Sequence, residues 1–180
     1  MRVLQINAVY GHGSTGVIVK DIFELCKKSN IECFVASPDP AVLLCENGYK
    51  IGNKFDYKLH AILSRIRGKQ AYFSAIPTKY LCKYIEQISP DIVHLHNVHS
   101  NYIHLNCLLK YLAGKGISVV ITLHDCWFYT GGCFHYTTSQ CMKWQTICGS
   151  CPRRYKDNPA YFYDSSHRIL NDRKKYFDGI

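Results

Sequence analysis

The sequence predicts an α/β fold: a parallel sheet with helices on both faces, together with a cysteine-rich loop insert. Short apolar runs rich in β-branched residues alternate with longer stretches in which apolar residues recur every three or four positions, the order expected of strands and helices in a parallel sheet. Polar residues directly follow several of the short runs, and open parallel sheets place ligand-binding groups at the carboxyl ends of their strands. The 180 residues suffice for one domain with its own core.

Five segments are predicted to be strands. The last of them is short, β-branched and apolar, and it is expected to be buried. In chain order the five are Arg2–Asn7, Ile31–Ser37, a weaker Tyr49–Gly52, Ile92–His96 and Val119–Leu123.

Helices are predicted between and after these strands. The first has an apolar stripe that should face the sheet, formed by Ile18, Ile22, Leu25 and Cys26. The remaining predicted helices span Asp56–Arg67, Thr78–Ser89, Asn101–Ala113 and Ser165–Phe177.

The composition is that of a protein without a membrane span. Its apolar runs are shorter than the ~18 residues that crossing a bilayer requires, and Met1-Arg2 leads straight into a strand and not into a secretion signal. We therefore expect a cytoplasmic protein. In that compartment ten cysteines stay reduced, so a cluster of them indicates metal binding or burial.

The formal net charge of +9 comes partly from two basic stretches, Lys54–Lys83 and Arg168–Lys175. They are either solvated helix faces or surfaces that attract an anion, such as a phosphorylated substrate or acidic lipid headgroups. The second alternative predicts peripheral association with an anionic membrane, on the inner face of the cell membrane. Nucleic acid is not an expected partner, because no recognition motif accompanies the charge.

A glycine-rich loop, Gly11–Gly16 (GHGSTG), lies between the first strand and the first helix. Glycines let backbone N–H groups approach a phosphate or a sugar in front of a helix N-terminus. The spacing matches the dinucleotide fingerprint G-x-G-x-x-G, which would indicate an NAD-type cofactor and would need Asp39 at the end of the second strand. Two alternatives remain: Ser14 and Thr15 cap the helix without any ligand, or the loop faces a ligand of another kind.

The motif HLHNVH places histidines at the end of the fourth predicted strand. His94 and His96 point to one face of the strand, and Asn97 and His99 come at or beyond its end. These residues line a sugar or phosphate pocket, form hydrogen bonds within the core, or ligate a metal.

His124 and Asp125 directly follow the fifth predicted strand. With an ordinary pKa of about 6.5, a histidine here can hydrogen-bond a substrate hydroxyl or a phosphate at cellular pH. The alternative is a structural histidine beside an aspartate that caps a helix.

Cys133, Cys141, Cys148 and Cys151 provide four thiolates, the number that a closed tetrahedral zinc site uses. The tight turn between the last two lets both sulfurs reach one metal. The sequence therefore predicts a structural zinc ion, and the alternative is a set of reduced, buried thiols. The other cysteines are expected to be small hydrophobic side chains: Cys26, Cys33, Cys45, Cys82, Cys107 and Cys126.

Four segments together resemble family-4 glycosyltransferases of bacterial surface-polysaccharide synthesis: GHGSTG, YKIGNKFDYKLHAILSRI, SPDIVHLHNVHSNYI, and VVITLHDCWFYTGGC with the cysteines and tryptophan that follow. The resemblance implies the GT-B architecture, in which two Rossmann-like domains face each other across a cleft. Residues 1–180 match the N-terminal, acceptor-side domain, with the cysteine-rich insert at 126–152. The C-terminal domain, which holds the nucleotide-sugar donor, is absent from the sequence, so the chain alone is expected to be inactive.

The resemblance also implies a reaction. A retaining enzyme transfers a sugar from a nucleotide-sugar donor to a saccharide acceptor, expected to be lipid-linked, in exopolysaccharide, capsule or O-antigen synthesis, and no catalytic metal is expected. By position in the family's motifs, His124 and Asp125 are the catalytic candidates, and Asn97 and His99 line the acceptor side. The loop residues that face the donor phosphates are Gly13, Ser14, Thr15 and Gly16. An NAD-type oxidoreductase domain and a non-catalytic zinc-containing domain remain as alternatives.

Overall fold

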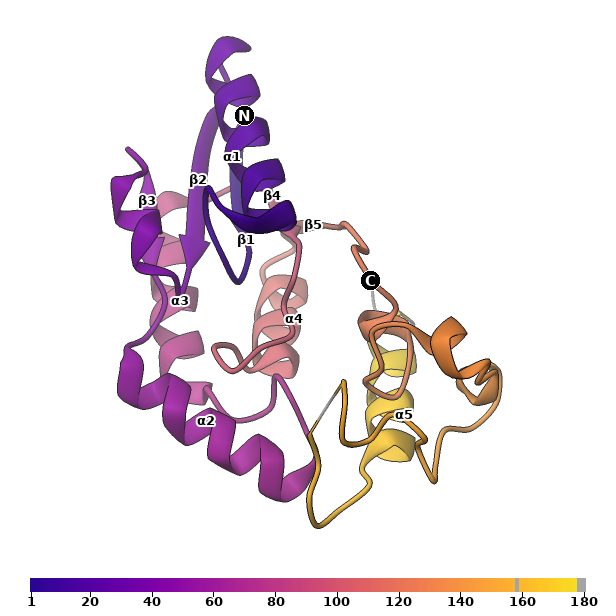
Figure 1. Ribbon diagram of the computed structural model, residues 1–180. Coiled ribbons are helices and arrows are strands. Elements are labelled where there is room, and N and C mark those ends of the chain that lie inside the picture. Colours follow the sequence, from indigo (N-terminus) through magenta and orange to yellow (C-terminus); the bar gives the residue numbers. More distant parts are fainter. Residues whose placement is uncertain (158, 178–180) are drawn as a thin grey trace.

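The computed structural model describes residues 1–157 and 159–177. Its strands form one five-stranded parallel sheet (Figure 1). The strand order is β3-β2-β1-β4-β5, so the chain moves outward from β1 to β3 and then returns across β1 to β4 and β5. The strands are β1 (Arg2–Ile6), β2 (Glu32–Ser37), β3 (Gly48–Lys50), β4 (Ile92–Leu95) and β5 (Ser118–Ile121). The predicted α/β sheet is confirmed, and its strand order reverses between β1 and β4, where such sheets bind ligands.

Helices cover both faces of the sheet, as predicted. They are α1 (Gly13–Lys28), α2 (Lys54–Arg67), α3 (Ala75–Ile88), α4 (Leu105–Gly114) and α5 (Ser166–Phe177). α1 packs on one face through Val19 and Phe23, whereas α3 and α4 pack on the other. In Figure 1 the cysteine-rich insert and α5 lie together to one side of the sheet. Within the described parts of the chain, no helix has the length and apolar character needed to cross a membrane.

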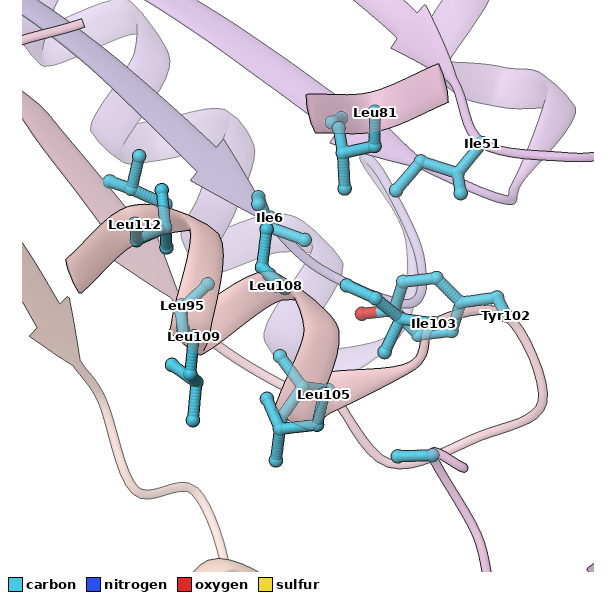
Figure 2. Packing of buried hydrophobic residues seen from close by; sticks show 14 of the residues in the cluster. Ile6, Ile51, Leu81, Leu95, Tyr102, Ile103, Leu105, Leu108, Leu109 and Leu112 are labelled. Atoms are coloured by element: carbon cyan, nitrogen blue, oxygen red, sulfur yellow. The ribbon is translucent and has the colours of Figure 1, made fainter. Parts of the chain in front are cut away.

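The larger core lies between the sheet and the pair α3 and α4. Leu4 and Ile6 of β1 and Leu95 of β4 are fully buried there, because alternate residues of a strand point to the same face. Figure 2 shows Leu108 and other leucines of α4 lying against Ile6 and Leu95. This packing holds the carboxyl ends of β1 and β4 at fixed positions.

The predicted apolar stripe of the first helix is wrong in part: Cys26 packs at the edge of the core and Ile22 is half-buried, but Ile18 and Leu25 are exposed. Leu25 is 63% exposed, and the buried face of α1 consists of Gly16, Val19 and Phe23. Gly16 permits a close approach on this face, because a Cβ atom there would lie 3.1 Å from the Val9 side chain, closer than most side chains can pack. Gly16 therefore lies against Val9 in the segment that precedes α1, and Val19 and Phe23 on the same face enter the core. Ile18, 40% exposed, lies with Leu25 outside the core.

Two further burial predictions are wrong. The segment Val119–Leu123 was expected to be buried, but β5 is the edge strand, and Val120 and Leu123 are 46% and 51% exposed. An edge strand has a neighbour on one side, so fewer residues cover it. Cys107, expected to be buried, is exposed because α4 faces the core through Leu105, Leu108 and its other leucines.

Candidate functional site

A buried asparagine joins the carboxyl ends of β1 and β4. Asn7 Oδ1 accepts a hydrogen bond from the Asn97 backbone N–H at 3.1 Å, and Asn7 Nδ2 donates to the Val9 carbonyl at 2.8 Å and to Thr15 Oγ1 at 3.3 Å. The acceptor candidate Asn97 and the loop candidate Thr15 are thereby held at one edge of the sheet. Asn7 was not among the predicted site residues. Its sequence signal is a polar residue directly after the apolar Ile6, at the carboxyl end of the first strand.

The glycine-rich loop closes on itself before α1. The Gly11 N–H donates to the Gly16 carbonyl at 2.9 Å. Gly11 and Gly13 have φ angles of 73° and 62°, in the left-handed region that favours glycine. Ser14, inside the first turn of α1, is exposed at the same edge.

The N-terminus of α1 has no side-chain cap. The N-cap residue is His12, and not Ser14 or Thr15 as predicted, because the helix already begins at Gly13. In the described chain the His12 side chain makes no capping hydrogen bond, and the first turn contains no acidic residue. The first-turn N–H groups and the positive end of the helix dipole can therefore receive an anion.

Asp39, the acid that an NAD-type site would need, is held by the loop. One of its oxygens lies 2.5 Å from His12 Nε2 and accepts from Tyr10 N–H at 3.3 Å, and the other accepts from Ala41 N–H at 3.0 Å. Burial raises the pKa of Asp39, but these hydrogen bonds outweigh it and hold the pKa below its usual value. Both oxygens of the Asp39 carboxylate therefore already have hydrogen-bond partners within the protein.

Three histidines form a stack across β4 and the end of β5. The rings of His94 and His96 lie 4.0 Å apart, and His96 Nδ1 lies 3.1 Å from His124 Nε2. His94 Nε2 lies 2.7 Å from Thr122 Oγ1. His96 is 3% exposed, and its contact with the more accessible His124 lies on the buried side of the stack. Of the three alternatives for the HLHNVH motif, hydrogen bonding within the protein describes His94 and His96.

Burial keeps these imidazoles neutral. It is the largest cause of the lowered pKa of His124, and for His96 burial together with the neighbouring imidazoles lowers the pKa to about 3. His94 also has a lowered pKa, again mainly from burial. A neutral His124 can donate or accept a hydrogen bond, but at cellular pH it presents no fixed positive charge.

His99 and Asp125 form a pair next to this stack. His99 Nε2 lies 2.9 Å from Asp125 Oδ2, and Asp125 Oδ1 accepts from the Trp127 N–H at 2.8 Å. Burial raises the pKa of Asp125, but the hydrogen bonds from His99 and Trp127 outweigh it and lower the pKa overall. Asp125 is thus an ionised group that orients His99. It also accepts a hydrogen bond within the turn after β5, but the N-cap residue of the 3₁₀ helix Trp127–Tyr129 is Cys126, and not Asp125 as the capping alternative expects.

Arg173 of α5 fixes the loop that follows His124 and Asp125. Its guanidinium lies 3.7 Å from the centre of the Trp127 ring, and its Nη1 donates to the carbonyls of Trp127 and Thr130, the latter at 2.7 Å. Arg173 is 2% exposed. The sequence placed it in a basic helix face, and no local pattern separates it from the exposed Lys174 and Lys175 beside it.

The cysteines of the insert gather around one small pocket. Cys133, Cys141, Cys148 and Cys151 all line it, and all four are free thiols. The insert also approaches α5 closely, because a Cβ atom at Gly131 would lie 2.6 Å from the Ser166 carbonyl oxygen. Across residues 1–157 and 159–177, no group of three or more His, Cys, Asp or Glu side chains is arranged to hold a metal ion.

Comparisons with known proteins identify the family. A family model described as "Glycosyl transferase 4-like" matches residues 6–143. The putative colanic acid biosynthesis glycosyl transferase WcaC of Escherichia coli (strain K12) is 28% identical over 93 residues, which are 49% of this chain and 22% of that protein. The crystal structure of SsfS6, a Streptomyces sp. SF2575 glycosyltransferase, aligns with a TM-score of 0.36 and 17% identity over 67% of this chain and 38% of that one. The chain thus matches less than a quarter of its curated relative. The family model covers more than half of the chain, including β2 to β5, the glycine-rich loop and the histidines at the strand ends. This chain therefore belongs to the glycosyl transferase 4-like family.

Proposed function

We propose that this chain is the acceptor-side domain of a cytoplasmic, retaining glycosyltransferase. The enzyme transfers a sugar from a nucleotide-sugar donor to a saccharide acceptor, which is lipid-linked, during synthesis of a bacterial surface polysaccharide. Family membership supports sugar transfer. The observation that carries the site assignment is the meeting of the glycine-rich loop, Asn97 and His124 at the carboxyl edge of one sheet.

The loop supplies the donor-facing part of the site in this proposal. The first turn of α1 consists of Gly13, Ser14, Thr15 and Gly16. Its uncapped N–H groups suit the phosphates of a nucleotide-sugar. In the oxidoreductase alternative, Asp39 would bind a ribose. That alternative has less support, because the Asp39 carboxylate already accepts hydrogen bonds from the loop and from the start of the next turn.

His124 is the proposed contact to the reacting sugar. Its neutral imidazole can hydrogen-bond a sugar hydroxyl, and the contact with buried His96 restricts its orientation. Asn97 and the His99–Asp125 pair lie beside it and would line the acceptor side. The nucleotide-binding domain that completes the GT-B cleft would come from a longer form of this protein or from a partner chain.

The test is transfer activity of the complete, two-domain enzyme. We expect His124→Ala to lower kcat by ~10²-fold or more, because the lost contact acts on the transition state. His167→Ala, which changes an exposed histidine on α5, is the matched control and should retain activity. Turnover near the wild-type value in the His124 variant would remove this residue from the site.

We also propose that Cys133, Cys141, Cys148 and Cys151 bind one structural zinc ion. Support comes from their shared pocket and from the absence of disulfides among these four described cysteines. The thiols are not in metal-binding positions as they stand, so binding would have to draw them together. The ion would shape the insert and take no part in the chemical step.

A further inference from the structure

The two basic stretches of the sequence meet at one cleft of the folded domain. Lys69 belongs to the first stretch, whereas Arg168 and Lys175 belong to the second. All three line a cleft of about 490 Å³ between α4 and α5 (Figure 1). Lys110 of α4 lines it as well. Cationic side chains from three separate segments of the chain therefore surround one hollow.

The side of α5 that faces the cleft carries much of this charge. Arg168, Asp172 and Lys175 line the cleft and are spaced by four and three residues, so they lie on one side of the helix. Lys110 lies on the opposite wall, which α4 forms. Lys69 comes from the segment that follows α2 and is half-buried, whereas the other three cations are exposed. The cleft is thus open to solvent and positively charged on both walls.

This positive charge is not balanced within the described chain. Of the described residues that line the cleft, Asp172 alone is acidic, and its Oδ2 already accepts from the Tyr72 hydroxyl at 3.0 Å. The Lys69 ammonium lies 5.1 Å from the centre of the Tyr72 ring. Among residues 1–157 and 159–177, the ion pairs involve other cations than the four of this cleft. An anion that entered the cleft would therefore meet unpaired cations.

The cations also repel one another. Burial is the largest cause of the lowered pKa of Lys69, and the neighbouring Arg168 guanidinium lowers this pKa further. Asp172 acts in the opposite direction but does not outweigh these two effects. Two like charges held close together in a half-buried place cost free energy, and an anion bound beside both would offset that cost.

We propose that the cleft between α4 and α5 binds a soluble molecule that carries more than one phosphate group. Guanidinium and ammonium groups make strong, charge-assisted hydrogen bonds to phosphate oxygens. Several phosphate charges balance four cations better than a single carboxylate does. The volume is that of a small-molecule site, and the rings of Tyr72 and Tyr176 give the organic part of the ligand a surface to pack on.

The shape of the cleft favours a soluble ligand over a membrane. Its cations line a hollow between two helices and do not form one flat face, so a molecule that enters the hollow contacts more of them than a bilayer surface would. None of the residues assigned to sugar transfer or to zinc lines the cleft. Phosphate binding here is therefore independent of the proposed function.

Pyrophosphate is the probe, and the reactivity of individual lysines is the readout. We expect pyrophosphate to protect Lys69, Lys110 and Lys175 from acetylation by an amine-reactive ester, measured for each lysine by mass spectrometry at constant ionic strength. Lys79 and Lys83, which are exposed on α3, should react as they do without pyrophosphate. Inorganic phosphate should protect the same three lysines at higher concentrations, because it carries fewer charges. Binding at the N-terminus of α1 would leave the cleft lysines reactive, so a failure here is distinct from a failure of the proposed function.

A double variant tests whether the cations of the cleft cause the protection. Lys110→Gln/Arg168→Gln removes one cation from each wall. It should raise the pyrophosphate concentration that half-protects Lys175 about tenfold or more, because charge-assisted hydrogen bonds to phosphate are lost. The matched control, Lys79→Gln/Lys83→Gln, removes the same charge from α3 and should behave like the wild type. Circular dichroism checks that both double variants are folded.

Three outcomes would overturn the proposal. The first is full reactivity of the cleft lysines in the wild-type chain at millimolar pyrophosphate, a result that needs no variant. The second is an equal loss of protection in the two double variants, which would mean that pyrophosphate responds to net charge alone. The third is protection by phosphatidylglycerol vesicles or by an acidic peptide but not by pyrophosphate, which would assign the cleft to a macromolecular surface.

Discussion

The sheet and the cysteine-rich insert are ordered in different ways. In the central strands β1 and β4, residues such as Leu4 and Leu95 are fully buried, and both faces of the sheet are packed against helices. In the insert, no residue from Cys133 to Ser150 is buried, and the regular structure consists of short 3₁₀ turns. Apolar burial accounts for the order of the sheet. The insert needs another source of stabilisation to stay ordered, because each ordered residue costs ~1–2 kcal/mol of backbone entropy.

Polar contacts from outside the insert supply part of that order. Asp157 accepts from the Phe134 N–H at 3.1 Å, and Asp164 accepts from the Cys151 N–H at 2.7 Å. Arg173 holds the start of the insert through the carbonyls of Trp127 and Thr130. The comparison therefore predicts that the two regions lose structure independently, each in response to a different perturbation.

Metal removal should have the largest effect, and it should be confined to the insert. Protein purified without chelator is expected to contain about one zinc per chain, and Cys148→Ser should lose it, because a structural zinc site supplies ~10 kcal/mol or more. Hydrogen exchange should then accelerate between Gly131 and Pro152 while the sheet stays protected. Cys107→Ser, at an exposed cysteine outside the insert, is the control. Wild-type protein that contains no zinc would show that the insert is ordered without a metal.

Removing the α5 anchor should have an intermediate effect. We expect Arg173→Met to cost ~2–3 kcal/mol of local stability, because two buried carbonyls lose their charged donor. Limited proteolysis should cleave faster within residues 126–157, and the urea unfolding of the sheet should change little. The same substitution at the exposed Lys175 is the control. Equal cleavage rates in the two variants would mean that Arg173 does not hold the insert.

A drop of one pH unit below ~6.5 should have the smallest effect, about 1.4 kcal/mol, and it should act on the sheet. An unfolded histidine takes up a proton below its ordinary pKa of about 6.5, whereas buried His96 has a pKa of about 3. The unfolded state therefore binds more protons in this range. The contribution of His96 is complete above pH ~6.5, and the free energy of unfolding falls by about 1.4 kcal/mol per pH unit as the pH drops toward 3.

His96→Phe removes this titration and should give a shallower dependence. Urea denaturation at several pH values between neutral and mildly acidic measures the slope. His60, buried against Ser74 with a pKa lowered by burial to about 4, accounts for part of the slope that remains. Parallel curves for the wild type and the variant would show that His96 is protonated equally in both states.

The sequence was sufficient to predict the sheet, because strand identity depends on local patterns of apolar and β-branched residues. It was also sufficient to place Asn97 and His124 at strand ends, since parallel strands share one carboxyl edge. The apolar face of α1 could not be predicted this way. Leu25 fits a helical stripe as well as Val19 does, and the close approach of Gly16 to Val9 decides between them.

Contacts between distant segments account for the other errors. The contact between His96 and His124 joins neighbouring strands whose register the sequence does not specify. Arg173 contacts Trp127 from 46 positions away, so its burial has no local signal.

The contact of Arg173 with Trp127 and Thr130 also constrains the order of events during synthesis on the ribosome. Every strand of the sheet has been made once Ile121 is added, whereas α5 follows about fifty residues later. At ~5–20 residues per second, this leaves the nascent chain roughly 3–10 s with a complete sheet and an unanchored loop after His124. Translation therefore produces the complete sheet before the segment that fixes the loop after His124, and a chain that terminates before Arg173 would fold its sheet without anchoring that loop.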